Sequence, residues 1–150
     1  MPDDALIMAQ ALAECAAQTM YATGAASRSL GIRIVGVTPG HAIVKMPVRP
    51  DMLDGQDVCH GGIIFALADS AFAFASNSYN IKAVTSSATI DFLTSAKAGE
   101  MLTAIAMERV RHGRTALYDV SVIKSDGTLV ALYRGKAHQI KGEIVPINIK

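Results

Sequence analysis

Residues 61–79 read GGIIFALADSAFAFASNSY, and this stretch sets the architecture of the chain. From Ile63 onward it is rich in Ala, Ile, Leu and Phe, and its apolar residues do not keep to one side of a helix. A helix that is apolar nearly all the way round is a buried helix. We therefore expect a central helix that the rest of the chain covers.

The sequence on both sides of this stretch has the patterns of β-strands. Apolar and polar residues alternate over residues 42–48, after a Pro39-Gly40 turn, and the pattern first changes near Ile32. Turn signals at Gly99, Gly113 and Gly127 separate the later segments. These segments are residues 83–93, 101–112, 115–124 and 128–140. We expect an α+β fold with two strands before the central helix and about four after it, in an antiparallel sheet wrapped around that helix.

The 150 residues fit a single domain, residues 1–150. Asp3 or Asp4 can cap a helix, and apolar residues then recur at helical spacing up to Gly24, which predicts an N-terminal helix over about residues 4–23. The core covers about residues 30–140, and residues 141–150 have no strong pattern and are expected to form a loose tail. The edge of the wrapped sheet needs protection, which a homodimer or homotetramer would give.

Composition narrows the classes of function. A net charge of +1 argues against binding nucleic acid. The longest apolar run, residues 63–75, is too short to span a membrane, and the first residues lack the basic charge of a signal peptide. Cys15 and Cys59 do not have the spacing of a disulfide framework or a zinc site. We expect a cytoplasmic protein that acts without metal or organic cofactor.

The strongest chemical signal is His60-Gly61-Gly62, followed by Asp69. Paired glycines before a helix often only form a tight turn, and a buried acid can be a structural ion pair. Asp69 lies in an apolar run, where burying an unpaired carboxylate costs several kcal/mol. Desolvation also makes a carboxylate a stronger base. Asp69 is therefore a candidate general base.

Four segments together resemble the PaaI-type thioesterases of phenylacetate degradation. They are MLDGQDVCHGG (residues 52–62), LADSAFA (67–73), IDFL (90–93) and YRGKAH (133–138). The resemblance runs from about residue 30 to residue 140, in the family's order and spacing. It implies the hotdog fold. It also implies hydrolysis of an acyl-CoA thioester, such as phenylacetyl-CoA or a hydroxylated derivative, to the free acid and CoA.

The resemblance assigns roles to the motif residues. The N–H of Gly61, at the start of the central helix, would polarise the thioester carbonyl, and Gly62 belongs to the same substrate-binding turn. A helix N-terminus suits this task because it offers unpaired N–H groups and a positive dipole end to an oxyanion. Asp69 would act as general base toward water or as nucleophile. His60 would order the loop rather than react.

One position departs from the family. Related thioesterases often carry Asn six residues before the motif histidine, where its side chain helps to hold the thioester carbonyl, whereas this chain has Asp54. An ionised carboxylate accepts hydrogen bonds but does not donate them. We therefore expect Asp54 to organise the loop or to bind water, which leaves the second carbonyl contact open.

Further polar and aromatic residues are candidates for contacts with the substrate. Thr85 and Ser86 match a region where the family places a hydroxyl near the attacking water, with an ordinary strand position as the alternative. Cys59 has no partner arrangement for a nucleophile. The candidates for the phosphates of CoA, each with a solvated strand face as the alternative, are Arg109, Arg111, Arg114, Arg134 and Lys136. The candidates for an aromatic pocket, with core packing as the alternative, are Phe72, Phe74, Tyr79 and Met101.

The spacing of Gly61 and Asp69 predicts a site shared by two chains. If the central helix begins near Gly61, Asp69 lies eight residues along it, or about 12 Å at a rise of about 1.5 Å per residue. One thioester carbon cannot reach both groups on one helix. Two antiparallel helices related by a twofold axis would form two such sites, each with one group from either chain.

Two other functions are compatible with a hotdog fold. A dehydratase of hydroxyacyl thioesters pairs a histidine with an acid on the helix, but no histidine occurs between Gly61 and Arg111. A non-catalytic acyl-CoA-binding domain usually carries a DNA-binding segment, and the 30 residues before the first strand are too few and too weakly basic to form one. Both are less well supported than thioester hydrolysis.

Overall fold

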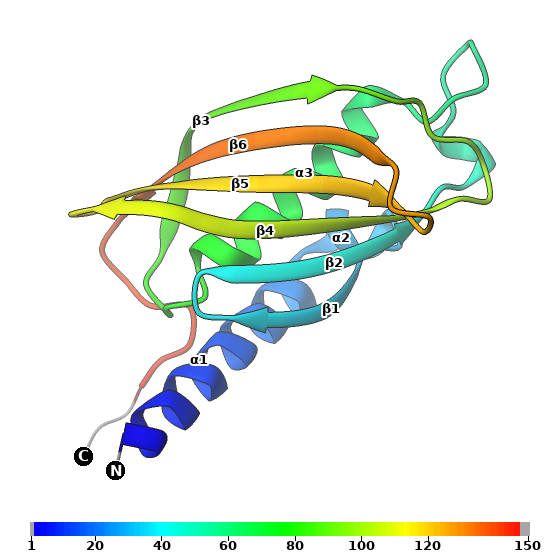
Figure 1. Ribbon diagram of the computed structural model, residues 1–150. Helices are drawn as coiled ribbons and strands as arrows, with labels where there is room; N and C mark the ends of the chain where they lie inside the picture. The colour runs from blue at the N-terminus through cyan, green and yellow to red at the C-terminus, as the bar shows by residue number, and fades with distance from the viewer. Residues whose placement is uncertain (1, 148–150) are drawn as a thin grey trace.

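The protein consists of a six-stranded sheet that curves over one long helix, α3 (Figure 1). The computed structural model describes residues 2–147. The helices are α1 (Pro2–Thr23), α2 (Ala25–Ser29), α3 (Gly61–Ser76) and a 3₁₀ turn, η1 (Pro50–Met52). The strands are β1 (Arg33–Thr38), β2 (His41–Pro47), β3 (Ala83–Phe92), β4 (Met101–His112), β5 (Thr115–Lys124) and β6 (Leu129–Gln139).

The sheet has the strand order β1-β2-β4-β5-β6-β3, and all neighbouring strands are antiparallel. The first two strands, β1 and β2, form one side of the sheet, and α3 then connects β2 to β3 at the opposite edge. The last three strands, β4, β5 and β6, lie between β2 and β3. This arrangement confirms the expected α+β hotdog fold, an antiparallel sheet around a central helix. The residue bounds of β4 and β5 agree with the predicted ones.

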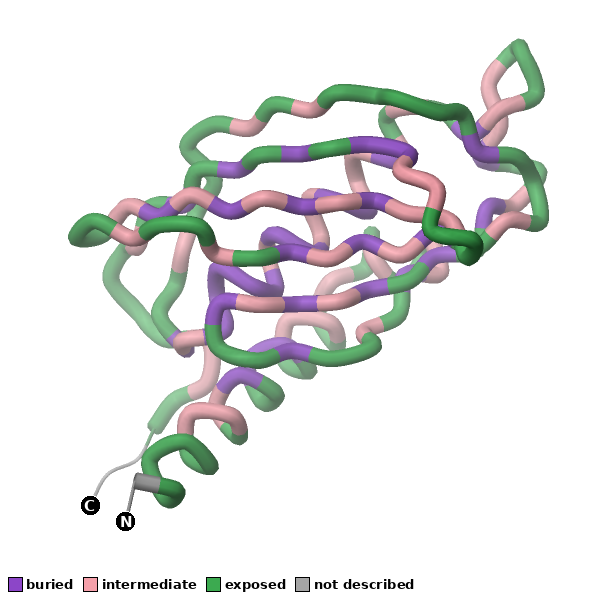
Figure 2. The backbone as a smooth tube through the Cα atoms, in the orientation of Figure 1, coloured by how far each residue is buried: buried purple, intermediate pink, exposed green. Residues whose placement is uncertain are grey.

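The core lies between α3 and the inner face of the sheet. Side chains alternate along β5 between buried and half-buried, as Figure 2 shows for the central strands. Small residues on the inner face let the sheet approach the helix; they include Ala104, Ala106, Ala131, Gly135 and Ala137, all buried. Leu67, Ala68, Ala71 and Phe72 of α3 fill the space against them.

The sheet packs against one side of α3, and a stripe on another side of this helix is only partly buried. Gly62 is exposed, and Ala66, Asp69 and Ala73 are half-buried. These four residues recur at steps of four, three and four, which places them along one stripe of the helix. A single layer of sheet cannot wrap a helix fully, which leaves this stripe without cover among the described residues.

The two edges of the sheet differ in how they are protected. At the β1 edge, α1 packs beside the strand, the side chain of Gln10 donates a hydrogen bond to the Val37 carbonyl at 2.8 Å, and a bulge interrupts the register at Val35. At the other edge, β3 pairs only with β6 within residues 2–147. Figure 2 shows β3 exposed along most of its length. The β3 edge is therefore open to another strand.

Two local predictions differ from the structure. The helix α2 was not predicted, because it has only five residues and its N-cap, Gly24, has no side chain to signal it. Residues 141–147, expected as a loose tail, are held by hydrogen bonds in which Asn80 pairs with both backbone groups of Val145, at 2.9 and 2.8 Å. The predicted tail residues 148–150 lie outside the described residues. Within residues 2–147, no helix combines the length and hydropathy needed to cross a membrane.

The contact between Gly135 and Phe72 gives a prediction about stability. A methyl group at Gly135 would lie 2.7 Å from two carbons of the Phe72 ring, so Gly135→Ala overpacks the core. We expect it to lower the free energy of unfolding by about 1–3 kcal/mol. Gly36→Ala is the control, because a methyl group there has no neighbour within 4 Å, and should change stability by less than about 0.5 kcal/mol. Equal urea-denaturation midpoints for the two variants would contradict the packing argument.

Candidate active site

His60 caps the N-terminus of α3. Its Nδ1 accepts a hydrogen bond from the Gly62 N–H at 2.9 Å, and its carbonyl accepts from Ile63 and Ile64. The expected ordering role of His60 thus has a geometric basis, because Nδ1 is the acceptor and holds the helix entry. The Gly61 N–H has no acceptor among residues 2–147. It is the free donor at the positive end of the helix.

An apolar cavity of about 300 Å³ lies beside Gly61. Its lining includes Ile64, Phe92 and Leu93, together with Val58 and Cys59. The ring of Phe92 lies so close to Gly61 that a methyl group there would be 3.2 Å from the Phe92 Cζ. The sequence analysis did not single out Phe92, although it is part of the IDFL segment. A larger residue at position 61 would press on this ring and require it to shift.

Asp54 organises the loop that leads into the motif. Its Oδ1 accepts hydrogen bonds from the backbone N–H of Gln56 at 2.8 Å and of Val58 at 3.4 Å. The Asp54 N–H also donates to the Val58 carbonyl at 2.8 Å. These bonds agree with the expected loop role of Asp54, and they need only acceptor oxygens from its side chain. The second carbonyl contact stays unassigned.

Cys59 is buried next to the cavity but lacks the features of a nucleophile. Burial raises the pKa of its thiol, and the charge of Asp54 raises it further. A thiol with a raised pKa carries little reactive thiolate at neutral pH. Cys59 therefore contributes packing to the site.

Asp69 lies in the middle of α3, half-buried, and is hydrogen-bonded. The hydroxyl of Tyr133, on β6, donates to its Oδ1 at 2.6 Å. Asp69 is thus less buried than its apolar surroundings in the sequence suggest, and its partner is a neutral hydroxyl and not a cation. The sequence analysis missed Tyr133 as a site residue, although it opens the YRGKAH segment. A contact between residues 64 positions apart leaves no local pattern in the sequence.

The helix geometry separates Gly61 from Asp69 as expected. α3 begins at Gly61, so Asp69 lies eight residues along the same helix. This spacing corresponds to about 12 Å along the axis. Within one chain, the free N–H and the carboxylate cannot contact the same thioester carbon.

Thr85 and Ser86 lie on the open edge strand β3. Both are exposed, and Ser86 is the extra residue where the register with β6 shifts. The Ser86 hydroxyl donates to the Lys136 carbonyl at 3.2 Å. One hydroxyl of the predicted pair is thus used within its own chain, and a role for Thr85 in binding stays a prediction.

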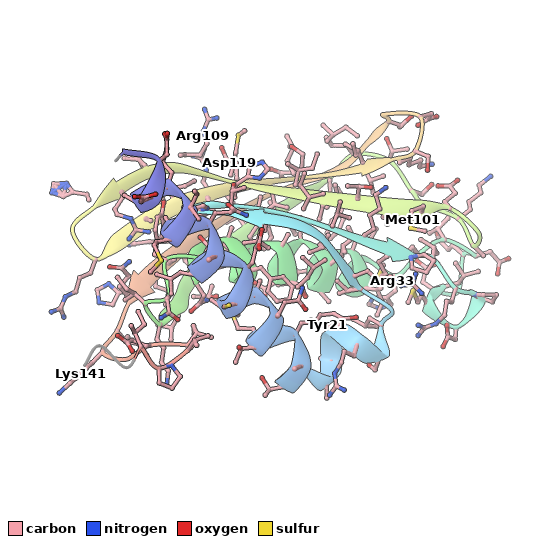
Figure 3. The ribbon with its side chains drawn as sticks, turned by 90° about the horizontal axis from the view of Figure 1, so that it is seen from below. Tyr21, Arg33, Met101, Arg109, Asp119 and Lys141 are labelled. Atoms are coloured by element: carbon pink, nitrogen blue, oxygen red, sulfur yellow. The ribbon has the colours of Figure 1, made fainter. Side chains whose placement is uncertain are left out.

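The candidate basic residues do not gather around Gly61 and Asp69 within one chain. Arg134 and Lys136 alternate with the inward-facing Tyr133 on β6, so they lie on the outer face of the sheet. Arg134 forms two hydrogen bonds with Asp119, at 2.6 and 2.9 Å, and these hold the pKa of Asp119 below its usual value. Figure 3 shows Arg109, at 3.4 Å from Asp119, on the same side of the sheet, away from α3.

The other two basic candidates have different surroundings. The Arg111 Nε lies 2.9 Å from Glu108, and its guanidinium lies 5.0 Å from the centre of the Tyr79 ring. Arg111 is thus held by its own chain. Arg114 is exposed in the turn between β4 and β5, where its carbonyl accepts a hydrogen bond from Gln139. It keeps a charged side chain available to a ligand.

The residues proposed for an aromatic pocket serve mainly in packing. Phe72 and Phe74 are buried in the core. The hydroxyl of Tyr79 donates to Glu108, and burial together with this bond raises the pKa of Tyr79 to about 12. Met101 lies at the start of β4, partly exposed. Among the side chains of the described residues, no group of three His, Cys, Asp or Glu could hold a metal ion.

Comparisons with known proteins agree with this architecture. A family model described as the thioesterase superfamily matches residues 56–131. The acyl-coenzyme A thioesterase PaaI of Escherichia coli (strain K12) is 45% identical over 128 residues, which cover 85% of this chain and 91% of the relative.

Two solved structures extend the comparison. The structure of the E. coli PaaI protein from the phenylacetic acid degradation operon matches with a TM-score of 0.88 and 43% identity, covering 89% of this chain and 97% of that chain. A protein from Streptococcus mutans UA159, solved bound to acetyl-CoA, matches with a TM-score of 0.71 and 28% identity, covering 75% of this chain and 90% of that chain.

The capping role of His60 predicts a pattern of stability. His60→Ala removes the acceptor for the Gly62 N–H and should lower the free energy of unfolding by about 1 kcal/mol, the usual cost of losing a helix cap. His60→Asn supplies a good N-cap acceptor and should stay close to the parent. Chemical denaturation followed by circular dichroism measures both. Equal losses in the two variants would show that the cap is not what His60 contributes.

Proposed function

The chain belongs to the thioesterase superfamily, and we propose that it hydrolyses aryl-CoA thioesters such as phenylacetyl-CoA to the free acid and CoA. Acyl-CoA thioester hydrolysis is its activity, in agreement with the 45% identity to the E. coli thioesterase PaaI. The choice of an aryl group is supported by the name of the operon that encodes this relative. Thioesterase relatives favour hydrolysis over the dehydratase and the non-catalytic binding domain.

The single observation that carries the mechanism is the free N–H of Gly61 at the start of α3. His60 occupies the neighbouring Gly62 N–H, so the Gly61 donor is left pointing out of the helix end. Thioester hydrolysis passes through a tetrahedral oxyanion, which such a donor stabilises. The apolar cavity beside Gly61 would hold the carbon chain of the substrate around this carbonyl.

Asp69 supplies the second group of the reaction. As general base, it takes a proton from water while the water oxygen attacks the thioester carbon. The oxyanion then collapses, the carbon–sulfur bond breaks, and the CoA thiolate leaves and accepts a proton. As nucleophile, Asp69 would form an anhydride first. Label found in the Asp69 carboxylate after a single turnover in ¹⁸O-water would show the nucleophilic route, because water reaches that carboxylate only by attacking the anhydride on its Asp69 side.

Two features support a site shared between two copies of the chain. The β3 edge is open along ten residues and has no proline or lysine to block pairing. The partly exposed stripe of α3 includes Gly62 and Asp69, and it begins beside Gly61, the first residue of this helix. Pairing of two β3 edges about a twofold axis would set two α3 helices antiparallel, with Gly61 of one near Asp69 of the other. The assembly is a homodimer, or a homotetramer built from two such dimers.

The remaining parts of the proposal concern the ligand and the surroundings. Gly62, Thr85 and Ser86 would lie near the reacting thioester, with Arg114 as the free cation for a CoA phosphate. Arg134 and Lys136 lie on the outer face of the sheet, away from α3. They would contact CoA only if the ligand extended over that face, or if the face lay beside the site of a partner chain. A CoA ligand is supported by the relative solved with acetyl-CoA. Two free cysteines support a cytoplasmic location.

The shared site predicts complementation between two inactive variants. Asp69→Asn keeps the shape but removes the base, and should lower turnover at least a hundredfold. Gly61→Val obstructs the amide and presses on Phe92, and should do the same. Co-expressed, they form a heterodimer with one intact site, and activity should return to about half of the parent per heterodimer. Gly55→Ala, which adds a methyl group in open space, is the control for loop substitutions.

The readout is release of free thiol from phenylacetyl-CoA by the purified heterodimer. A heterodimer that assembles but remains as inactive as its parent variants would contradict the shared site. Full activity of the Asp69→Asn homodimer would contradict the role of Asp69 itself.

Hydrolysis without a cofactor predicts resistance to chelation. The proposed groups are a backbone N–H and a carboxylate, so turnover of phenylacetyl-CoA should be unchanged in excess EDTA. Loss of activity that zinc or magnesium restores would contradict this mechanism.

A further inference from the structure

The hydrogen bond from Tyr133 to Asp69 has no part in the mechanism so far. It joins β6 to the middle of α3, with 2.6 Å between the Tyr133 hydroxyl oxygen and Asp69 Oδ1, which is a short hydrogen bond between two oxygens. Tyr133 is 2% exposed. Within residues 2–147, Asp69 has no salt bridge, and Tyr133 is the one titratable side chain hydrogen-bonded to it.

Aromatic packing fixes the position of the Tyr133 ring. Phe65 lies edge-on to it with the ring centres 5.4 Å apart, and Phe72 lies tilted against it at 5.7 Å. Phe72 fits there because Gly135 has no side chain. A ring held on two sides by other rings has little freedom to turn its hydroxyl away from Asp69.

We propose that Tyr133 is the positioning residue for Asp69: its hydroxyl holds Oδ1 and leaves Oδ2 as the oxygen that meets the attacking water or the thioester carbon. This inference rests on the proposed function of Asp69. Oδ2 has no hydrogen-bond partner among the described residues. The bond thus divides the two carboxylate oxygens into one that is anchored and one that is free to react. An Asp side chain on a helix otherwise rotates freely about its carboxylate bond.

The state of Tyr133 suits this task over the whole neutral range. Burial, with the hydrogen bond to Asp69 as the second cause, raises the pKa of Tyr133 well above its usual value. The hydroxyl therefore keeps its proton and remains a donor.

A purely structural role is the alternative, because a buried tyrosine hydroxyl needs a partner wherever it lies. The chain offers a matched control. Tyr118 is also fully buried, and its ring packs edge-on against Phe72 with the ring centres 5.5 Å apart. Its hydroxyl accepts a hydrogen bond from Arg111 at 3.3 Å and does not contact Asp69. Both Tyr→Phe changes remove one buried hydroxyl and keep the ring. Only Tyr133→Phe removes a bond to Asp69.

The experiment compares Tyr133→Phe and Tyr118→Phe with the parent, using phenylacetyl-CoA over a range of pH. For Tyr133→Phe we expect kcat to fall about tenfold or more with KM within about twofold, because substrate binding does not use this hydroxyl. Tyr118→Phe should leave both kcat and KM unchanged, whatever it costs in stability.

Each outcome has one meaning. An unchanged kcat in folded Tyr133→Phe would overturn the positioning role. Equal losses of kcat in Tyr133→Phe and Tyr118→Phe would also overturn it, because core disturbance would then explain both. Asp69→Asn, measured beside them, tests the premise: if it retains turnover, the proposed function of Asp69 fails. If it is inactive while Tyr133→Phe is fully active, only the present inference fails.

Discussion

The rest of the structure depends on one constraint: a single layer of sheet covers only one side of a helix that is apolar nearly all round. The inner face of the sheet takes Leu67, Ala71 and Phe72 of α3, and small residues on the strands let the two layers approach. The remaining stripe, with Gly62, Ala66, Asp69 and Ala73, stays partly uncovered. This partly exposed stripe is the part of α3 that a second copy of the chain would cover in the proposed assembly.

The two edges of the sheet differ: the β1 edge is covered, and the β3 edge is open to a further strand. The β1 edge is closed by α1, by the Gln10 side chain and by a bulge, which together prevent further pairing. The β3 edge has a bulge at Ser86 but no helix or side chain that covers it among the described residues, and it adjoins β6, the strand that carries Tyr133. A partner that adds to β3 therefore also approaches the uncovered stripe of α3. Among the described residues, the β3 edge and the stripe of α3 both lack a covering element.

The strands and the start of the central helix could be predicted from the sequence because local patterns encode them. Contacts between distant residues could not be predicted in this way. The bounds of β4 and β5 follow from alternation ended by Gly113 and neighbouring turns, and the start of α3 follows from the His60-Gly61-Gly62 motif. The five-residue α2 has no such signals. The anchoring of residues 141–147 by Asn80, the ring of Phe92 over Gly61 and the bond from Tyr133 to Asp69 all join distant parts of the chain. Local patterns do not record such contacts.

The polar residues of the motif divide into those that build the site and those left free to react. The Nδ1 of His60 accepts a hydrogen bond from the Gly62 N–H, and the Oδ1 of Asp54 accepts hydrogen bonds from two backbone N–H groups of the loop. Both are thereby committed to shaping the turn, and the turn presents one free donor, the Gly61 N–H. Asp69 follows the same logic, since Tyr133 takes one of its oxygens and leaves the other. The reacting groups of the proposed mechanism are therefore one backbone N–H and one carboxylate oxygen, each available because its neighbour is already hydrogen-bonded. Since these two groups lie eight residues apart on one helix, they can meet on one thioester only across two chains.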